Sequence, residues 1–138
     1  MLKHPFLNLP YVPKLQYFLG GFDIYDREDS LGVAIATYDI NLPEDRAYLI
    51  KHLIIDRSSD LSYRHKKSLM DVLGAALDDS EFNFSKVLRQ DLTSHCSLPC
   101  GWDCMENPRK FFEAIFKLAN EGWRDDLEKA SLEDQSTW

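Results

Sequence analysis

The stretch that decides the fold runs from Leu61 to Leu77 and reads LSYRHKKSLMDVLGAAL. At about 100° per residue, its apolar side chains fall on roughly half of a helical wheel. An apolar arc this wide is broader than one neighbouring helix requires, so the pattern predicts a central helix with other helices around it. We expect Asp60 to be its N-cap. The residues expected to end it are Asp78, Asp79 and Ser80.

Composition indicates a single folded domain. The chain has 138 residues, of which 44% are hydrophobic and 12% aromatic, and this is enough to bury a core. It contains 23 acidic and 16 basic residues, for a net charge of −7. Binding to nucleic acid or to an anionic membrane requires a basic face, so this charge argues against both partners. A basic protein is the partner class that the charge favours.

No stretch of the sequence is apolar for long enough to span a bilayer. The first residues, MLKHPFLNLPYVPK, lack the continuous apolar region of a signal peptide. We therefore expect a cytoplasmic protein. In that reducing compartment the three cysteines would be thiols.

Helical patterns recur on both sides of the central stretch. The predicted helices cover residues 13–19, 31–41, 42–56, 81–92 and 108–121. Asn107 followed by Pro108 is the strongest start signal. The sequence therefore predicts one all-α domain over residues 1–138, a compact helical bundle. Residues 1–12 form an irregular arm because they are interrupted by prolines, and residues 129–138 form a polar C-terminal tail that frays.

One region leaves a second interpretation open. In residues 31–41, the apolar positions match both the period of a helix and the alternation of a strand. A helix is favoured because Ser30 can cap it and because Ala34 and Ala36 are good helix formers. The alternative is a hairpin in residues 31–56, which would make the fold α+β.

The cysteines lie in a loop with a histidine, which raises the question of a metal site. His95, Cys96, Cys100 and Cys104 are ligand types for zinc or an iron–sulfur cluster. The spacing departs from that of paired zinc ligands, and the sequence has no second pair. We therefore expect no metal, no cofactor and no catalytic residues. The alternative is a metal-binding regulator or a small enzyme that uses this loop.

The acidic excess is concentrated in two regions. Residues 21–30 carry four acids and one base, for a charge of −3, and residues 78–106 carry six acids and two bases, for −4. Aromatic side chains ringed by acids are typical of an interface with a basic protein, although acids also serve solubility. The predicted partner-binding residues are Asp23, Tyr25, Asp26, Glu28, Asp29, Asp78, Asp79, Glu81, Asp91, Trp102 and Asp103.

The N-terminal part resembles a known family, the helical immunity proteins of bacterial contact-dependent growth inhibition. In those proteins an aromatic helix ends in a Gly-Gly-aromatic turn followed by aspartate. The matching residues here are Tyr17, Phe18, Gly20, Gly21, Phe22, Asp23 and Asp26. The resemblance covers residues 1–30 and does not extend to residues 57–92 or to the cysteine loop.

The resemblance implies a cytosolic inhibitor that binds the C-terminal toxin domain of a cognate exported protein, often a nuclease. Nucleases are basic around the active site because they hold phosphates, so an acidic inhibitor suits them. Binding could cover the active site or an exosite. Besides the metal-binding alternative, a helical adaptor for another basic protein also remains open.

Overall fold

The computed structural model describes residues 2–3, 8–22, 28–58, 61–88, 102 and 105–138. Within these residues the fold is all-α, as predicted, with one isolated antiparallel bridge between Lys3 and Pro10. The α-helices are α1 (Val33–Ala36), α2 (Pro43–Ile50), α3 (Tyr63–Asp78), α4 (Ser85–Leu88), α5 (Pro108–Gly122) and α6 (Arg124–Ser131). Shorter segments are the 3-10 helices η1 (Leu15–Phe22) and η6 (Gln135–Thr137) and the π-helical η2 (Glu28–Gly32) and η3 (Lys51–Ile55).

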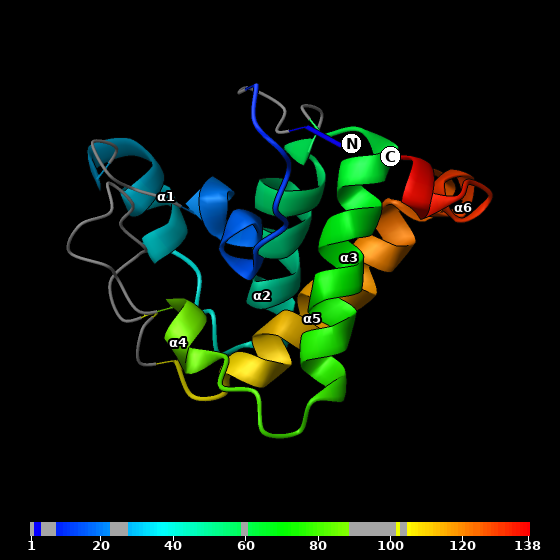
Figure 1. The fold of residues 1–138 in the computed structure, drawn as a ribbon. Coiled ribbons are helices and arrows are strands. Elements are labelled where there is room, and N and C mark those ends of the chain that lie inside the picture. The colour runs from blue at the N-terminus through cyan, green and yellow to red at the C-terminus, as the bar shows by residue number, and fades with distance from the viewer. Residues whose placement is uncertain (1, 4–7, 23–27, 59–60, 89–101, 103–104) are drawn as a thin grey trace.

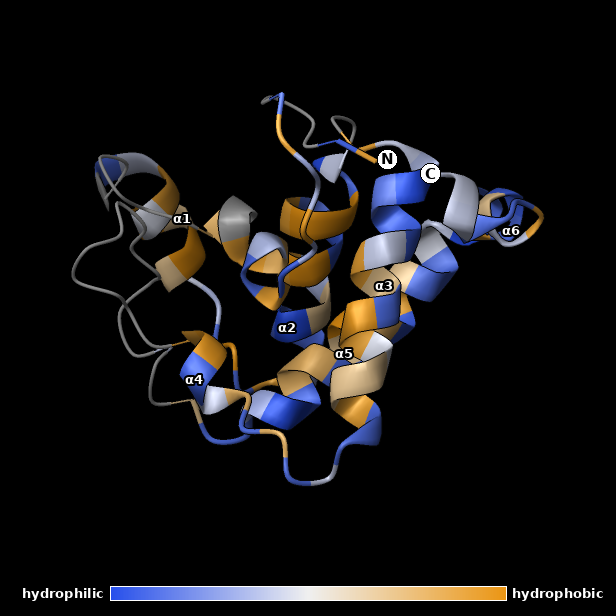
Figure 2. Cartoon of the chain, viewed as in Figure 1, coloured by the Kyte–Doolittle hydropathy of each residue, from blue (hydrophilic) through white to orange (hydrophobic). Residues whose placement is uncertain are grey.

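The predicted central helix is α3, which contacts α5, α6 and η1 (Figure 1). Its N-cap is Ser62, whose Oγ accepts a hydrogen bond from the backbone N–H of His65 at 3.3 Å. The expected cap, Asp60, lies outside the described residues. The helix begins at Tyr63 because the Ser62 hydroxyl is placed to satisfy a free N–H of the first turn. Polar and apolar residues alternate along α3 and α5, as expected for amphipathic helices (Figure 2).

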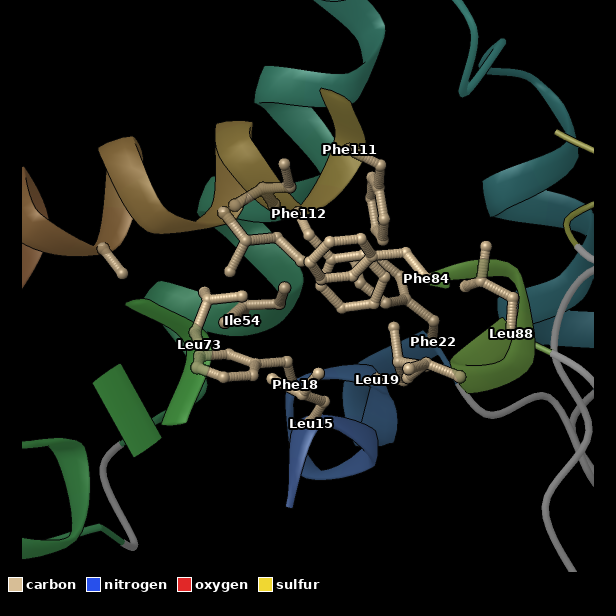
Figure 3. Packing of buried hydrophobic residues seen from close by; sticks show 14 of the residues in the cluster. Leu15, Phe18, Leu19, Phe22, Ile54, Leu73, Phe84, Leu88, Phe111 and Phe112 are labelled. Carbon is tan, nitrogen blue, oxygen red and sulfur yellow. The ribbon is translucent and has the colours of Figure 1, made fainter. Parts of the chain in front are cut away.

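Aromatic side chains dominate the core between η1, α4 and α5 (Figure 3). Phe22, Phe111 and Phe112 are fully buried. The ring of Phe111 lies 6.1 Å from that of Phe22 and 5.4 Å from that of Phe112, measured between centroids. Phe84, just before α4, stacks on Phe112 at 4.9 Å. Each such ring pair adds about 0.5–1.5 kcal/mol to the stabilisation that burial provides.

Residues 31–36 and 43–55 are helical, so the hairpin alternative is wrong, although the helix predicted over residues 31–41 ends at Ala36. They form the end of η2, then α1, and then α2 running directly into η3. The expected cap Ser30 differs from the prediction, and α2 has no side-chain cap. Ser30 lies inside η2, and Asn41 accepts a hydrogen bond from the backbone N–H of Glu106 at 3.1 Å, while Leu42 occupies the N-cap of α2. Asn41 therefore ties α2 to the segment before α5, a contact that local sequence does not reveal.

Two helix boundaries were also mispredicted. The first helix, η1, continues through Gly20 and Gly21 to Phe22, so the two glycines do not end it. Burial of Phe22 explains this difference, because the chain must carry its ring into the core. In the described part of the predicted helix 81–92, only α4 is helical.

The C-terminal residues contact the beginning of α3. Glu133 forms an ion pair with Arg64, with 2.8 Å between Oε1 and Nη2, and accepts a hydrogen bond from the Tyr63 hydroxyl. This hydrogen bond lowers the pKa of the Glu133 carboxyl. The Trp138 Nε1 donates to the same carboxylate at 3.2 Å. The end of the chain is therefore tied to the beginning of α3 (Figure 1).

Two helical glycines offer a matched stability test. A Cβ on Gly122 would lie 2.6 Å from Cγ2 of Ile55, whereas a Cβ on Gly74 would lie 3.3 Å from Cε2 of Phe116. We expect Gly122→Ala to lower the free energy of unfolding by about 1–3 kcal/mol because η3 must shift. In Gly74→Ala, the gain in helix propensity of about 1 kcal/mol offsets the tighter contact. Urea unfolding of both variants measures the difference, and equal effects would contradict the close approach of α5 and η3.

Candidate functional site

Three of the predicted partner-binding residues lie together at the C-terminal end of α3. Asp78, Asp79 and Glu81 are all exposed, and we call them the acidic edge. Asp79 Oδ1 accepts a hydrogen bond from the backbone N–H of Glu81 at 3.0 Å, which shapes the turn. The ion pairs among the described residues lie elsewhere: His52–Asp56, Arg64–Glu133, Lys66–Asp126 and Lys67–Asp71. Within that part of the chain, the three carboxylates have no cationic partner.

Arg109, from the first turn of α5, holds the acidic edge in place. Its Nη2 donates to the carbonyl oxygens of Asp79 at 2.7 Å and Phe82 at 3.3 Å, and its Nη1 donates to that of Leu77 at 3.1 Å. The guanidinium carbon also lies 4.9 Å from the centroid of the Phe84 ring. The guanidinium thus binds backbone oxygens of the turn and not its carboxylates. These contacts fix the turn while the carboxylates remain exposed.

Trp102 was predicted as a partner-binding anchor, and the structure contradicts this role. Its side chain is only 4% exposed. The indole ring lies 4.7 Å from Phe22 and 5.7 Å from Phe111, between ring centroids. Trp102 therefore completes the aromatic core between η1 and α5. A residue buried in this way cannot reach a partner without unfolding the core.

The remaining predicted residues are distributed as follows. Glu28 and Asp29 belong to η2, and Asp29 is exposed. Helix α1, which follows η2, lies well away from the lower end of α3, so these acids and the acidic edge are separate surfaces (Figure 1). The predicted residues that lie outside the described part of the chain are Asp23, Tyr25, Asp26, Asp91 and Asp103. The possible metal ligands His95, Cys96, Cys100 and Cys104 also lie outside it.

A second surface, which the sequence did not reveal, lies between α1, α2 and η3. It is a groove of about 300 Å³, which we call the tyrosine groove, and its main lining residues are Ala34, Ile35, Tyr38, Tyr48, Leu49 and His52. Tyr38 and Tyr48 stack with ring centroids 4.8 Å apart and planes inclined by 21°. The His52 ring follows at 4.2 Å from Tyr48. Three rings therefore form a continuous wall above an apolar floor.

Electrostatic contacts link the tyrosine groove to nearby acids. His52 Nδ1 lies 3.3 Å from an Asp56 carboxylate oxygen, one helical turn away. A hydrogen bond to Tyr48 raises the pKa of the Tyr38 hydroxyl, and the negative charge of Asp45 raises it further. Tyr38 therefore stays protonated at neutral pH.

One feature of the sequence could have indicated this groove, namely the four-residue spacing of Tyr48 and His52. Residues four apart share one face of a helix, so an exposed aromatic pair could have been predicted there. The sequence could not have shown that Tyr38 joins this aromatic pair, because its stacking on Tyr48 depends on how α1 packs against α2. The periodicity of residues 31–41 assigns Tyr38 only to an apolar helix face.

Comparison with known proteins adds no relative. No protein-family model matches this chain, and comparisons with curated proteins and with solved structures find no match either. Among the described residues, no three or more His, Cys, Asp or Glu side chains are grouped as a metal site would require. No helix in that part of the chain is long and apolar enough to cross a membrane. The candidate site therefore consists of the acidic edge and the tyrosine groove.

Proposed function

We propose that this protein is a cytoplasmic immunity protein that binds a basic toxin domain and neutralises it without catalysing a reaction. The observation that carries the proposal is the acidic edge, three exposed carboxylates on a turn fixed by Arg109. The N-terminal resemblance to immunity proteins points to the same class. In this proposal, the carboxylates pair with lysine and arginine side chains of the toxin.

Two physical arguments support a binding role for the acidic edge. Carboxylates on a turn that is already ordered lose little conformational entropy when they meet a partner, so more of the interaction energy is retained. Acids on an exposed surface also attract a basic protein over distances near the Debye length and speed its association. A nuclease toxin suits this mechanism because its phosphate-binding surface is basic.

The proposal can be tested through the neighbouring gene, because immunity proteins are encoded beside their toxins. The protein encoded immediately upstream would be expressed alone and together with this chain. We expect growth inhibition by the upstream product, relief by co-expression, and a stoichiometric complex on size-exclusion chromatography. An upstream product that is harmless, or that does not bind, would refute the proposal.

Charge reversal tests the acidic edge within such a complex. We expect Asp78→Lys, Asp79→Lys and Glu81→Lys together to slow association about tenfold at low salt, because steering depends on the local potential. Stopped-flow mixing at several salt concentrations measures this rate. The double variant Asp78→Lys, Glu81→Lys keeps Asp79, whose Oδ1 accepts the hydrogen bond from the Glu81 N–H. It therefore separates the effect of charge on the association rate from any effect of a changed turn.

A charge-matched control uses three exposed acids on α5 and α6, Glu113, Glu121 and Glu128. Reversing these three changes the net charge by the same amount on a different part of the surface. We expect a much smaller effect on the association rate. Equal slowing by both triple variants would show that net charge alone matters and that the acidic edge is not the binding site.

A further inference from the structure

A second groove lies directly beside the acidic edge, between α3, the beginning of η1 and α4. Its volume is about 490 Å³, and we call it the α3 groove. Segment η1 contacts both α3 and α4, so these three elements form its walls (Figure 1). The apolar residues that line the α3 groove are Leu15, Val72, Ala75, Ala76, Phe82 and Val87.

Helix α3 contributes one stripe of side chains to the groove. Val72, Ala75, Ala76 and Asp79 are spaced i, i+3, i+4 and i+7, so they share one face of the helix. Ala75 is exposed and Val72 is half-buried, although both are apolar. Alanine side chains are short and leave room above the helix. The stripe is therefore a part of the apolar arc of α3 that the described part of the chain leaves open.

The wall next to the acidic edge has a fixed shape. Arg109 donates to the carbonyl oxygens of Asp79 and Phe82, two residues that line the groove. The ring of Phe82 also lies 4.7 Å, between centroids, from that of the buried Phe84. A wall that is already ordered needs little rearrangement to accept a ligand, which favours binding.

The described lining of the α3 groove includes two charged residues of opposite sign on different walls. Asp79 follows α3 and belongs to the acidic edge, whereas the exposed Lys14 directly precedes η1. Neither residue forms an ion pair within the described part of the chain. An occupant that places a base near Asp79 and an acid near Lys14 satisfies both charges.

The length of the stripe sets the length of the occupant. From Val72 to Asp79 the helix advances about 10 Å, at about 1.5 Å per residue. An extended chain advances about 3.3 Å per residue, so about three of its residues cover this distance. The groove therefore suits a short extended segment and not a whole helix.

We propose that the α3 groove binds a short extended apolar segment of the basic partner, with a base at one end and an acid at the other. The apolar side chains lie against Ala75, Ala76 and Val87. The base pairs with Asp79 and the acid pairs with Lys14. This inference rests on the proposed function for the nature of the partner, and it deepens that function by placing an apolar contact beside the acidic edge.

The direct test uses a defined probe, a pentapeptide of lysine, leucine, alanine, leucine and glutamate with both termini capped. Its binding to the ¹⁵N-labelled protein would be followed by backbone amide shifts, beside a matched peptide with serine in place of each leucine. We expect shifts concentrated at Val72, Ala75 and Ala76, and binding about tenfold weaker for the serine peptide. Shifts centred elsewhere, equal binding of both peptides, or no binding at millimolar concentration would overturn the inference.

Two variants test the assigned charge pairs. Asp79→Asn removes the charge but keeps a side-chain oxygen for the Glu81 N–H. We expect the preference for the lysine peptide over its acetyl-lysine analogue to fall two- to fivefold in this variant, about the worth of an exposed ion pair. Lys14→Gln should lower the preference for glutamate over glutamine at the other end by a similar factor. An unchanged preference in either variant would refute the proposed arrangement of charges.

A longer side chain at Ala75 should block the groove. Ala75 is exposed, so Ala75→Gln extends into the groove without displacing the core, and glutamine is a good helix former. We expect peptide binding to weaken about tenfold. The matched control is Ala36→Gln, the same change at an exposed alanine of α1 that does not line the groove. Dispersed amide spectra confirm that both variants are folded, and retained affinity in Ala75→Gln would refute binding in the groove.

The upstream toxin distinguishes failure of the inference from failure of the proposed function. If that protein binds and Ala75→Gln leaves its dissociation constant unchanged, the groove inference is wrong and the proposed function stands. If the peptide binds in the α3 groove and no toxin is neutralised, the proposed function is wrong and the groove remains a site for apolar segments with oppositely charged ends.

Discussion

Replacing Phe111 by alanine is expected to lower the free energy of unfolding by about 3–5 kcal/mol. Phe111 is fully buried and packs against Phe22, Phe112 and Trp102, so its removal leaves a cavity bounded by η1 and α5. A domain of this size is stable by only about 5–15 kcal/mol, so the variant loses a large part of its stability. Urea unfolding followed by tryptophan fluorescence and by circular dichroism measures the change.

Glu113→Ala is the control on the same helix, because Glu113 is exposed two residues further along α5. We expect its effect to stay within about 0.5 kcal/mol. A loss below about 1.5 kcal/mol for Phe111→Ala would contradict the packing described for this core, because truncation of a buried phenylalanine costs more than that. Coincidence of the two optical transitions would show that both variants unfold in one step.

Replacing Arg109 by methionine is expected to have the second largest effect, lowering the free energy of unfolding by about 2–3 kcal/mol. The substitution keeps an apolar stem but removes the bonds to the carbonyl oxygens of Leu77, Asp79 and Phe82. Lys110→Met changes an exposed charge at the next position and is expected to be nearly neutral. Chemical denaturation measures the free energies of unfolding of the two variants, which can then be compared.

Arg109→Lys distinguishes the shape of the guanidinium from its charge. Lysine keeps the positive charge but cannot direct a planar fork of donors at several carbonyls, so most of the loss is expected to remain. If the proposed function holds, both Arg109 variants should also bind the basic partner more weakly, although neither removes a carboxylate, because the acidic edge is then less ordered. Stability equal to the unmodified protein in Arg109→Lys would show that charge alone holds the turn.

Particular residues show why the sequence was informative about helices and less so about surfaces. The start of α5 was predicted because Asn107 and Pro108 act locally: Asn107 Oδ1 accepts from the Lys110 N–H at 3.2 Å. The residues of the acidic edge were predicted because acids are concentrated in residues 78–106, a feature that can be counted from the sequence. Trp102 was misassigned because whether an indole faces a partner or the core depends on where η1 and α5 lie.

The sequence by itself determined the all-α class, the position of the central helix and the acidic character of the chain. Each of these follows from periodicity, capping residues or charge counts, which act over a few residues or need no structure. The tertiary structure alone decided that Arg109 fixes the acidic edge, that the C-terminal residues are tied to α3 and that Tyr38 stacks on Tyr48. These contacts join elements far apart in sequence or on different helices, and they arise only when the buried faces of the helices pack together.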